Sequence, residues 1–315
     1  MKHNSKIYVA GHNGLVGSAI MRALFADGYT NIVTRTFDEL DLRDQRAVHL
    51  FFEQEKPEYV FLAAARVGGI KANSEYPADF MYDNLMIQNN IIHAAYQYQV
   101  KKLLFLGSSC IYPRLCPQPI KEEYLLTSAL EPTNEPYALA KIAGLKLCQA
   151  YNKQYGTKFI VVMPTNLYGP GDTFDLQSSH VLPALLAKFI HARDAQLPTV
   201  QVWGTGTVRR EFLYVDDLAH AVLFLMRHYQ GQDWINIGAG HDCSIAELAV
   251  LIREIVGFTG EIVFDVTQPE GTPRKLLDSS KINALGWQPK MTLRAGIEQT
   301  LAWYETSLPT REKIV

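Results

Sequence analysis

Cysteine is scarce in this sequence, with four residues among 315. They are Cys110, Cys116, Cys148 and Cys243, and no two of them form a Cys-x-x-Cys pair. This spacing indicates neither a disulfide framework nor a zinc site. We therefore expect free thiols and no metal centre.

Long apolar runs and basic clusters are also missing. No stretch reaches the roughly 18 consecutive apolar residues that mark a membrane-spanning helix. The polar residues 1–6 lead directly into a strand-like segment, so we expect no signal peptide and a cytoplasmic location. A formal net charge of -2 without basic clusters argues against nucleic acid or an anionic membrane as a partner. The class that remains is a protein that handles a small molecule.

The sequence does contain a strand, a glycine turn and a helix start near its beginning. Residues 6–10 are rich in β-forming side chains and end at Gly11, and Gly14 and Gly17 follow before an apolar helical pattern. Such glycines let the backbone turn sharply and approach a pyrophosphate, whose charge the free N–H groups of a helix N-terminus attract. The spacing is Gly-x-x-Gly-x-x-Gly rather than Gly-x-Gly-x-x-Gly, and a turn that serves only close packing is the alternative.

Strands and helices alternate through the first half of the chain. Strands are predicted over residues 31–34, 59–64, 102–107 and 158–163, and long helices over residues 78–98 and 135–155. This alternation predicts an α/β fold with a Rossmann-like, doubly wound parallel sheet. We expect a dinucleotide-binding domain over residues 1–170, with additional segments from about residues 212–240, and a smaller substrate lobe made mainly of residues 171–315.

The residue after the predicted second strand is Arg35. In a dinucleotide fold, an acidic residue at this position holds the ribose 2′-hydroxyl of NAD, whereas an arginine accommodates the 2′-phosphate of NADP. Arg35 therefore favours NADP(H). Asp38, Glu39 and Asp41 follow closely, and a solvated arginine is the alternative.

Two groups of residues have side chains suited to catalysis. Tyr137 and Lys141 lie four residues apart at the start of a helix, so both project from one face, and the ammonium should lower the pKa of the phenol and suit it to act as a general acid. Ser108 and Cys110 follow a buried strand, where a hydroxyl can bind a substrate carbonyl and a thiolate can remove a proton next to it. The alternatives are a solvated helix pair and an inert core cysteine.

Several longer motifs add to these features, and together they span nearly the whole chain. They are Ala10-Gly11-His12, Val67-Gly68-Gly69-Ile70, Tyr76-Pro77-Ala78-Asp79-Phe80, Gly107-Ser108-Ser109-Cys110-Ile111-Tyr112-Pro113, Glu131-Pro132-Thr133-Asn134-Glu135-Pro136-Tyr137-Ala138, the loop of residues 164–170, Arg210-Glu211-Phe212-Leu213, and the run of residues 271–278. The chain resembles the extended short-chain dehydrogenase/reductases that act on nucleotide sugars. It is similar to the branch that inverts C3 and C5 of GDP-4-keto-6-deoxy-D-mannose and then reduces C4 with NADPH, giving GDP-L-fucose.

The resemblance implies a role for each candidate residue. Cys110 is expected as the base and His180 as the acid of the epimerisation, with Tyr137 as the acid of the reduction, assisted by Lys141 and Ser108. His180 also precedes a predicted helix, whose N-terminus makes an imidazole easier to deprotonate. The implied cofactor contacts are Gly11, Asn13, Gly14, Leu15, Val16, Gly17, Arg35, Asp41, Leu42, Ala64, Lys141, Pro164, Thr165, Asn166, Leu167 and His180, and the implied substrate contacts are Lys188, Trp203, Arg210 and Glu270. The family also implies a homodimer.

The chain departs from the family pattern at three positions. Asn13 stands in the glycine turn where relatives carry arginine, Lys188 offers a point charge in place of a planar guanidinium, and Glu270 replaces an aspartate. Two enzyme alternatives are an NAD-dependent nucleotide-sugar 4-epimerase and a 4,6-dehydratase, although a dehydratase needs a carboxylic acid beside the serine. A non-catalytic NADPH-binding sensor is the third, and it would have no need of the tyrosine–lysine pair.

Overall fold

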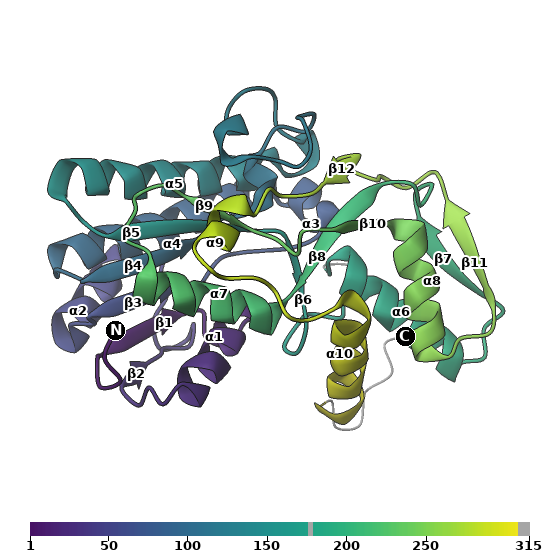
Figure 1. Cartoon of the computed structure of the whole chain (residues 1–315), viewed down its shortest axis with the longest axis horizontal. Helices are drawn as coiled ribbons and strands as arrows, with labels where there is room; N and C mark the ends of the chain where they lie inside the picture. The colour runs from purple at the N-terminus through teal and green to yellow at the C-terminus, as the bar shows by residue number, and fades with distance from the viewer. Residues whose placement is uncertain (176–178, 308–315) are drawn as a thin grey trace.

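A six-stranded parallel sheet organises the N-terminal half of the chain in this computed structural model, which describes residues 1–175 and 179–307 (Figure 1). Its strand order is β2-β1-β3-β4-β5-β9, which confirms the predicted doubly wound sheet. The strands are β1 (Ile7–Ala10), β2 (Ile32–Val33), β3 (Tyr59–Leu62), β4 (Lys102–Leu106), β5 (Phe159–Pro164) and β9 (Ile235–Ile237). The edge strand β2 is shorter than predicted, because only two of its residues pair with β1.

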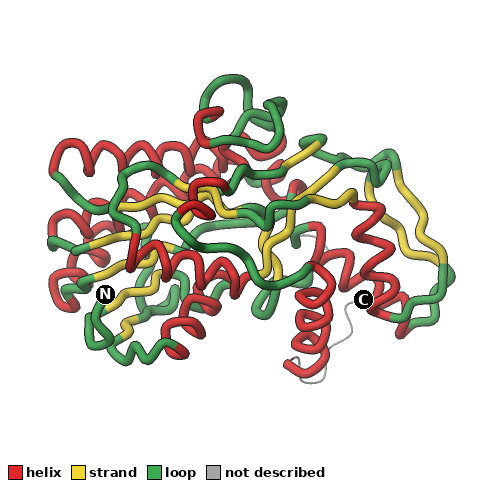
Figure 2. The backbone as a smooth tube through the Cα atoms, in the orientation of Figure 1, coloured by secondary structure: helices red, strands yellow, loops and turns green. Residues whose placement is uncertain are grey.

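Helices cover both faces of this sheet (Figures 1 and 2). One face carries α2 (Gln45–Glu55), α4 (Pro77–Gln97) and α5 (Glu135–Tyr155), and the other carries α1 (Leu15–Ala26), α7 (Val215–His228) and α9 (Ser280–Ala284). Successive strand residues alternate between the two cores, so Tyr8 and Phe105 pack in the first whereas Ile7 and Leu104 pack in the second. Because both faces are covered, the strands read as nearly continuous apolar runs.

The C-terminal lobe has a core of its own, beside the carboxyl ends of the sheet strands (Figure 1). Its helices are α6 (Val181–Asp194), α8 (Ile245–Val256) and α10 (Leu293–Ser307), and its parallel strand pair is β7 (Thr199–Trp203) with β11 (Glu261–Asp265). Ser244 and Glu247 form a capping box that starts α8, and Gly257 ends it. Between the lobes, β8 (Arg209–Tyr214) pairs with β6 (Asn166–Tyr168), β10 (Asp242–Ser244) and β12 (Arg274–Lys275).

Four short helices complete the described chain, and all of them adjoin loops at the carboxyl edge of the sheet or above it. They are α3 (Ile70–Glu75), η1 (Ser109–Ile111), η2 (Glu122–Tyr124) and η3 (Pro132–Asn134). The helix η1 continues directly from β4, and η3 runs into α5. The loop after β4, which contains Ser108 and Cys110, therefore lies beside the start of α5, which contains Tyr137 and Lys141.

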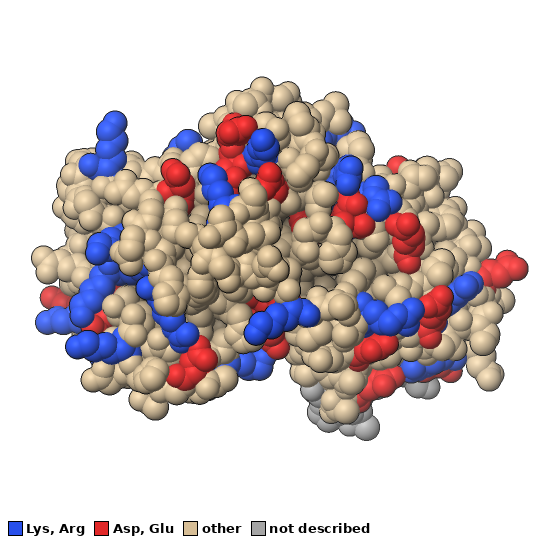
Figure 3. Space-filling view, in the orientation of Figure 1, with Lys and Arg blue, Asp and Glu red and all other residues tan. Residues whose placement is uncertain are grey.

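The surface is mixed in charge, with acidic and basic side chains on both lobes of the face shown in Figure 3. In residues 1–175 and 179–307, no helix is long and apolar enough to cross a membrane. Within the same ranges, no group of three or more His, Cys, Asp or Glu side chains is placed to hold a metal ion. All four cysteines are free thiols, as predicted.

Candidate active site

The backbone of the glycine turn after β1 packs so closely against its neighbours that a side chain on Gly11 or Gly17 would collide with them. Gly11 has φ +84°, and a Cβ on it would lie 2.7 Å from backbone atoms of Ala64 at the end of β3. A Cβ on Gly17 would lie 2.0 Å from the Gly11 carbonyl oxygen. Gly14 donates its backbone N–H to that same oxygen (3.1 Å) and is the N-cap of α1. The N-terminus of α1 therefore lies against the ends of β1 and β3, and this arrangement fits a dinucleotide pyrophosphate.

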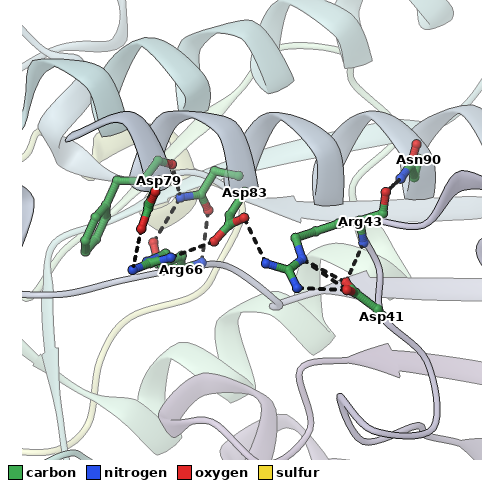
Figure 4. A network of polar contacts seen from close by, with 8 residues as sticks. Asp41, Arg43, Arg66, Asp79, Asp83 and Asn90 are labelled. Carbon is green, nitrogen blue, oxygen red and sulfur yellow. Dashed lines mark hydrogen bonds and ion pairs between the residues drawn. The ribbon is translucent and has the colours of Figure 1, made fainter. Parts of the chain in front are cut away.

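Polar side chains of α4 hold the loops that follow β2 and β3 through a network with Arg43 and Arg66 of those loops (Figure 4). Asp83 accepts hydrogen bonds from Arg43 (3.1 Å) and Arg66 (2.8 Å), and Arg43 also binds both carboxylate oxygens of Asp41. Burial by itself would raise the pKa of Asp83, but the hydrogen bonds from the two arginines outweigh it and lower that pKa. Asn90 donates to the backbone carbonyls of Leu42 and Arg43. The network thus fixes the backbone of Asp41 and Leu42, two predicted cofactor contacts.

Arg35 lies at the end of β2, beside α2. Its guanidinium pairs with Glu55 (2.6 Å), donates to the Thr34 carbonyl and stacks over the ring of Phe51. Its assignment to a 2′-phosphate stays a prediction. Asn13 is exposed in the glycine turn.

The segment after β5 contains four predicted cofactor contacts. Pro164 ends β5, Thr165 donates its hydroxyl to the Glu211 carbonyl (3.1 Å), and Asn166 and Leu167 begin β6. The next turn packs on α1, since a Cβ on Gly171 would lie 3.0 Å from the Ser18 hydroxyl. The structure thus brings this segment close to the start of α1, near Leu15 and Val16.

Tyr137 and Lys141 lie in the first two turns of α5, and the Lys141 nitrogen is 5.9 Å from the centre of the Tyr137 ring. Lys141 is 3% exposed and donates to the carbonyl oxygen of Leu106 (2.9 Å). Burial lowers the pKa of Lys141 to about 7. Burial and the nearby Cys110 raise the pKa of Tyr137. This result corrects our expectation of a lowered pKa for Tyr137, because the loss of hydration outweighs the neighbouring ammonium.

Ser108 and Cys110 follow β4 and lie at the N-terminal end of α5. The Ser108 hydroxyl accepts a hydrogen bond from the Cys110 backbone N–H (3.2 Å), and its interaction with the Tyr137 hydroxyl partly offsets the rise in the pKa of that phenol. The Cys110 sulfur accepts from the side-chain amide of Asn134 (3.4 Å) and from the ammonium of Lys275 (3.7 Å). The structure therefore brings together the serine, cysteine and tyrosine predicted from sequence. It also places two residues that were not predicted, Asn134 and Lys275, against the Cys110 sulfur.

The two added residues escaped the sequence analysis for different reasons. Asn134 precedes α5 directly, inside a motif that had been singled out, but nothing in its type suggested a contact with sulfur. Lys275 is 165 residues from Cys110, so no spacing pattern connects them. The only available signal was its place in the run of residues 271–278.

His180 is the N-cap residue of α6, as predicted, and it is exposed to solvent. Desolvation by nearby protein atoms lowers the pKa of His180, and the positive charge of Lys275 lowers it further by a smaller amount. The direction agrees with the prediction, although the main cause is desolvation rather than the helix N-terminus. Lys275 thus acts on both His180 and Cys110, and this links the proposed acid to the proposed base.

The four predicted substrate residues surround the end of β7. The Lys188 ammonium lies 5.5 Å from the ring centre of Trp203, which is 39% exposed. The Glu270 carboxylate accepts from the hydroxyl (2.6 Å) and backbone N–H of Thr205, and the Glu270 carbonyl accepts from Arg210 (2.9 Å). Burial lowers the pKa of Arg210, and the charge of Cys110 opposes this effect. The Arg210 guanidinium therefore lies within electrostatic reach of Cys110.

Residues 7–238 match the NAD dependent epimerase/dehydratase family. The chain belongs to this family. It is 60% identical over 301 residues to GDP-L-fucose synthase 1 of Arabidopsis thaliana, covering 96% of this chain and 93% of that relative. It is 54% identical over 309 residues to GDP-L-fucose synthase of Escherichia coli K12, covering 95% of this chain and 96% of that relative.

A solved structure extends the comparison to the fold. The GDP-mannoheptose C4 reductase from Campylobacter jejuni, with NADP bound, matches with a TM-score of 0.89 at 43% identity, covering 97% of this chain and 100% of that one. Together with the two synthases, this similarity confirms the resemblance to the nucleotide-sugar branch of the NAD dependent epimerase/dehydratase family.

Proposed function

We propose that this protein converts GDP-4-keto-6-deoxy-D-mannose to GDP-L-fucose. It inverts C3 and C5 and then reduces the C4 ketone with NADPH in the same site. The observation that carries the proposal is 54% to 60% identity over nearly the full length of GDP-L-fucose synthases. The grouping of Ser108, Cys110 and Tyr137 at the carboxyl edge of the sheet supports it.

NADP(H) supplies the hydride for the ketone when it is bound. The cradle at Gly11, Gly14 and Gly17 suits its pyrophosphate, because a Cβ at Gly11 or Gly17 would collide with backbone atoms. Residues that would hold the rest of the cofactor surround this turn. They are Asn13, Leu15, Val16, Arg35, Asp41, Leu42, Ala64, Lys141, Pro164, Thr165, Asn166, Leu167 and His180.

In the epimerisation, the 4-keto group acidifies the hydrogens at C3 and C5. Cys110 removes such a proton, and the hydroxyls of Ser108 and Tyr137 bind the enolate oxygen that forms. The Lys275 ammonium, 3.7 Å from the sulfur, balances the negative charge of a thiolate. His180 returns a proton on the opposite face, and its lowered pKa makes its imidazolium a stronger acid.

In the reduction, Tyr137 gives its proton to the O4 oxygen. Its raised pKa keeps the phenol protonated until that oxygen becomes basic. Lys141 lies under the Tyr137 ring and is held by the Leu106 carbonyl, so its position is defined before the phenol loses its proton. When Lys141 is protonated, its ammonium stabilises the phenolate that remains.

The proposed reaction also suggests roles for the predicted substrate contacts, the two lobes and the dimer contact. Trp203 would stack on guanine, Lys188 and Arg210 would bind the diphosphate, and Glu270 would contact a sugar or ribose hydroxyl. Residues 1–170, with segments from about 212–240, form the NADP-binding domain in this proposal, and residues 171–315 mainly bind the nucleotide sugar. We propose that the enzyme is a cytoplasmic homodimer that contacts its partner through α4 and α5, with neither nucleic acid nor membrane as a partner.

The test follows NADPH absorbance after GDP-4-keto-6-deoxy-D-mannose is added, with NADH in parallel and the product sugar identified. We expect one NADPH consumed for each GDP-L-fucose formed, and slower oxidation of NADH. No oxidation with either cofactor would overturn the proposal and favour an epimerase or dehydratase of another nucleotide sugar. A reduced product that is inverted at neither carbon would favour a simple C4 reductase, the activity named for the Campylobacter jejuni relative.

A further inference from the structure

A small cavity of about 10 Å³ lies beside Cys110, between the loops that surround the sulfur. Its polar lining includes Glu131, Asn134, Thr272 and Lys275. This volume is about enough for one water molecule, and water binds in such a space where several polar groups face it. Nothing in the chemistry described above uses Glu131.

Two buried oxygens in the lining residues have no hydrogen-bond donor in the described part of the chain. Glu131 is 7% exposed, and its Oε1 accepts from the backbone and hydroxyl of Thr133. Its Oε2 accepts no hydrogen bond, although the Arg114 guanidinium lies 3.2 Å away as an ion pair. The Asn134 Oδ1 is also without a donor, while its amide nitrogen donates to the Cys110 sulfur. Leaving a buried acceptor such as the Asn134 oxygen without a donor is costly, and the ion pair with Arg114 leaves Glu131 Oε2 free to accept a hydrogen bond, so a donor is expected in this cavity.

One water molecule in this cavity can serve both oxygens and the sulfur. It can donate one hydrogen to Glu131 Oε2 and the other to Asn134 Oδ1, while its oxygen accepts from the Cys110 thiol or the Lys275 ammonium. Such a water would connect the cysteine to a carboxylate whose ionic partner, Arg114, is 49% exposed. The chain of contacts therefore runs from the sulfur towards the surface.

The proposed function creates a need for this connection. In each inversion a C–H bond breaks, its electron pair stays on the sugar as the enolate, and the proton forms the S–H bond of Cys110. His180 then loses its N–H proton to the opposite face of the same carbon. After the first inversion Cys110 is a thiol and His180 is neutral, so neither can act in the second inversion until both are reset.

We propose that Glu131 and the cavity water form a proton-exchange site that regenerates the Cys110 thiolate between the two inversions. The S–H bond breaks as its proton passes to the water, and the water gives another proton to Glu131 Oε2, which releases it at the Arg114 surface. His180 takes its proton from solvent, so protons balance without an oxidant or reductant. This inference rests on the proposed function.

The test compares the wild-type chain with Glu131→Gln, which keeps the size of the side chain and its acceptor for Thr133 but does not take up a proton. Single turnovers with substrate and NADPH in D2O are quenched, and each product sugar is assayed for inversion and deuterium at C3 and C5. Glu123→Gln is the matched control, because Glu123 is an exposed glutamate elsewhere in the same loop region. Thr272→Ile is the second variant, since it fills the cavity and leaves the carboxylate in place.

We expect Glu131→Gln and Thr272→Ile to perform the first inversion within about twofold of wild type and the second at least about tenfold more slowly, the scale of a lost acid–base step. Sugar inverted at only one carbon should then accumulate, and Glu131→Asp should restore part of the second inversion. Equal slowing of both inversions would show a merely structural role and overturn the relay, as would wild-type product ratios in both variants. A wild-type chain that inverts neither carbon would overturn the proposed function, and the relay with it.

Discussion

Lys141 carries an ammonium that the fold buries almost completely, and replacing it with methionine should change how stability depends on pH. Burial lowers the pKa of Lys141 from 10.5 to about 7. Methionine has a similar length and no charge, so Lys141→Met removes the titration while filling the same space. The ligand-free protein is the right sample, because the effect belongs to the fold alone.

The direction in which stability changes with pH depends on whether the folded or the unfolded chain holds the Lys141 proton. Between pH 7 and pH 10.5 the unfolded chain keeps the lysine proton and the folded chain has lost it. Stability therefore rises with pH in this window, by about 1.4 kcal/mol per pH unit, and the lysine contributes no slope below or above it. From pH 7.5 to pH 9.5, the free energy of unfolding of wild type should rise by roughly 3 kcal/mol relative to Lys141→Met.

The assay is urea unfolding at intervals of half a pH unit, and the quantity compared is the difference between the two proteins at each pH. Other groups that titrate in this range cancel in that difference. Lys153→Met is the control, because Lys153 is an exposed lysine of the same helix and should give a curve parallel to wild type. Parallel curves for Lys141→Met and wild type would refute the argument that burial controls this lysine.

Three further predictions concern the site. Cys110→Ser should slow epimerisation by about 100-fold or more while NADPH affinity stays within about twofold, and an equal loss of both would count against Cys110 as the base. Tyr137→Phe should let the inverted keto sugar accumulate without reduction, measured by product analysis, and an undiminished rate of NADPH oxidation would rule out its role as acid. Gly17→Ala would place a Cβ 2.0 Å from the Gly11 oxygen, so it should lower both thermal stability and NADPH affinity. Gly14→Ala, whose Cβ would lie at 3.5 Å from that oxygen, should retain stability, and equal destabilisation would contradict the steric argument.

Local patterns were enough to predict the sheet and the cofactor turn. Alternating apolar runs and helical periods depend on neighbours within a few turns, and both cores of the sheet contain the expected residues. The glycine spacing likewise reports a local steric demand, which the contacts of Gly11 and Gly17 make explicit. The length of β2 was overestimated because an edge strand ends where its single neighbour stops pairing.

The pKa shifts and ion pairs of the site could not be predicted from the spacing of residues along the sequence. The four-residue separation of Tyr137 and Lys141 placed them on one helix face correctly, but it predicted a lowered pKa for the tyrosine where the fold raises it. Desolvation depends on every atom packed around the ring, most of them distant in sequence. The pairing of Arg35 with Glu55 and the arginine network around Asp83 arise in the same way, from side chains on separate elements.

The sequence by itself determined which chemical groups this protein has and which elements carry them, because residue type and short-range periodicity are properties of the chain. Only the tertiary structure decided which groups act together. Lys275 reaches Cys110 across 165 residues, and Glu131 shares a cavity with that cysteine, because β12 and the loop before α5 pack against the end of β4. Contacts between distant segments depend on the packing of the whole core, and that packing decides which charged and titratable side chains lie together.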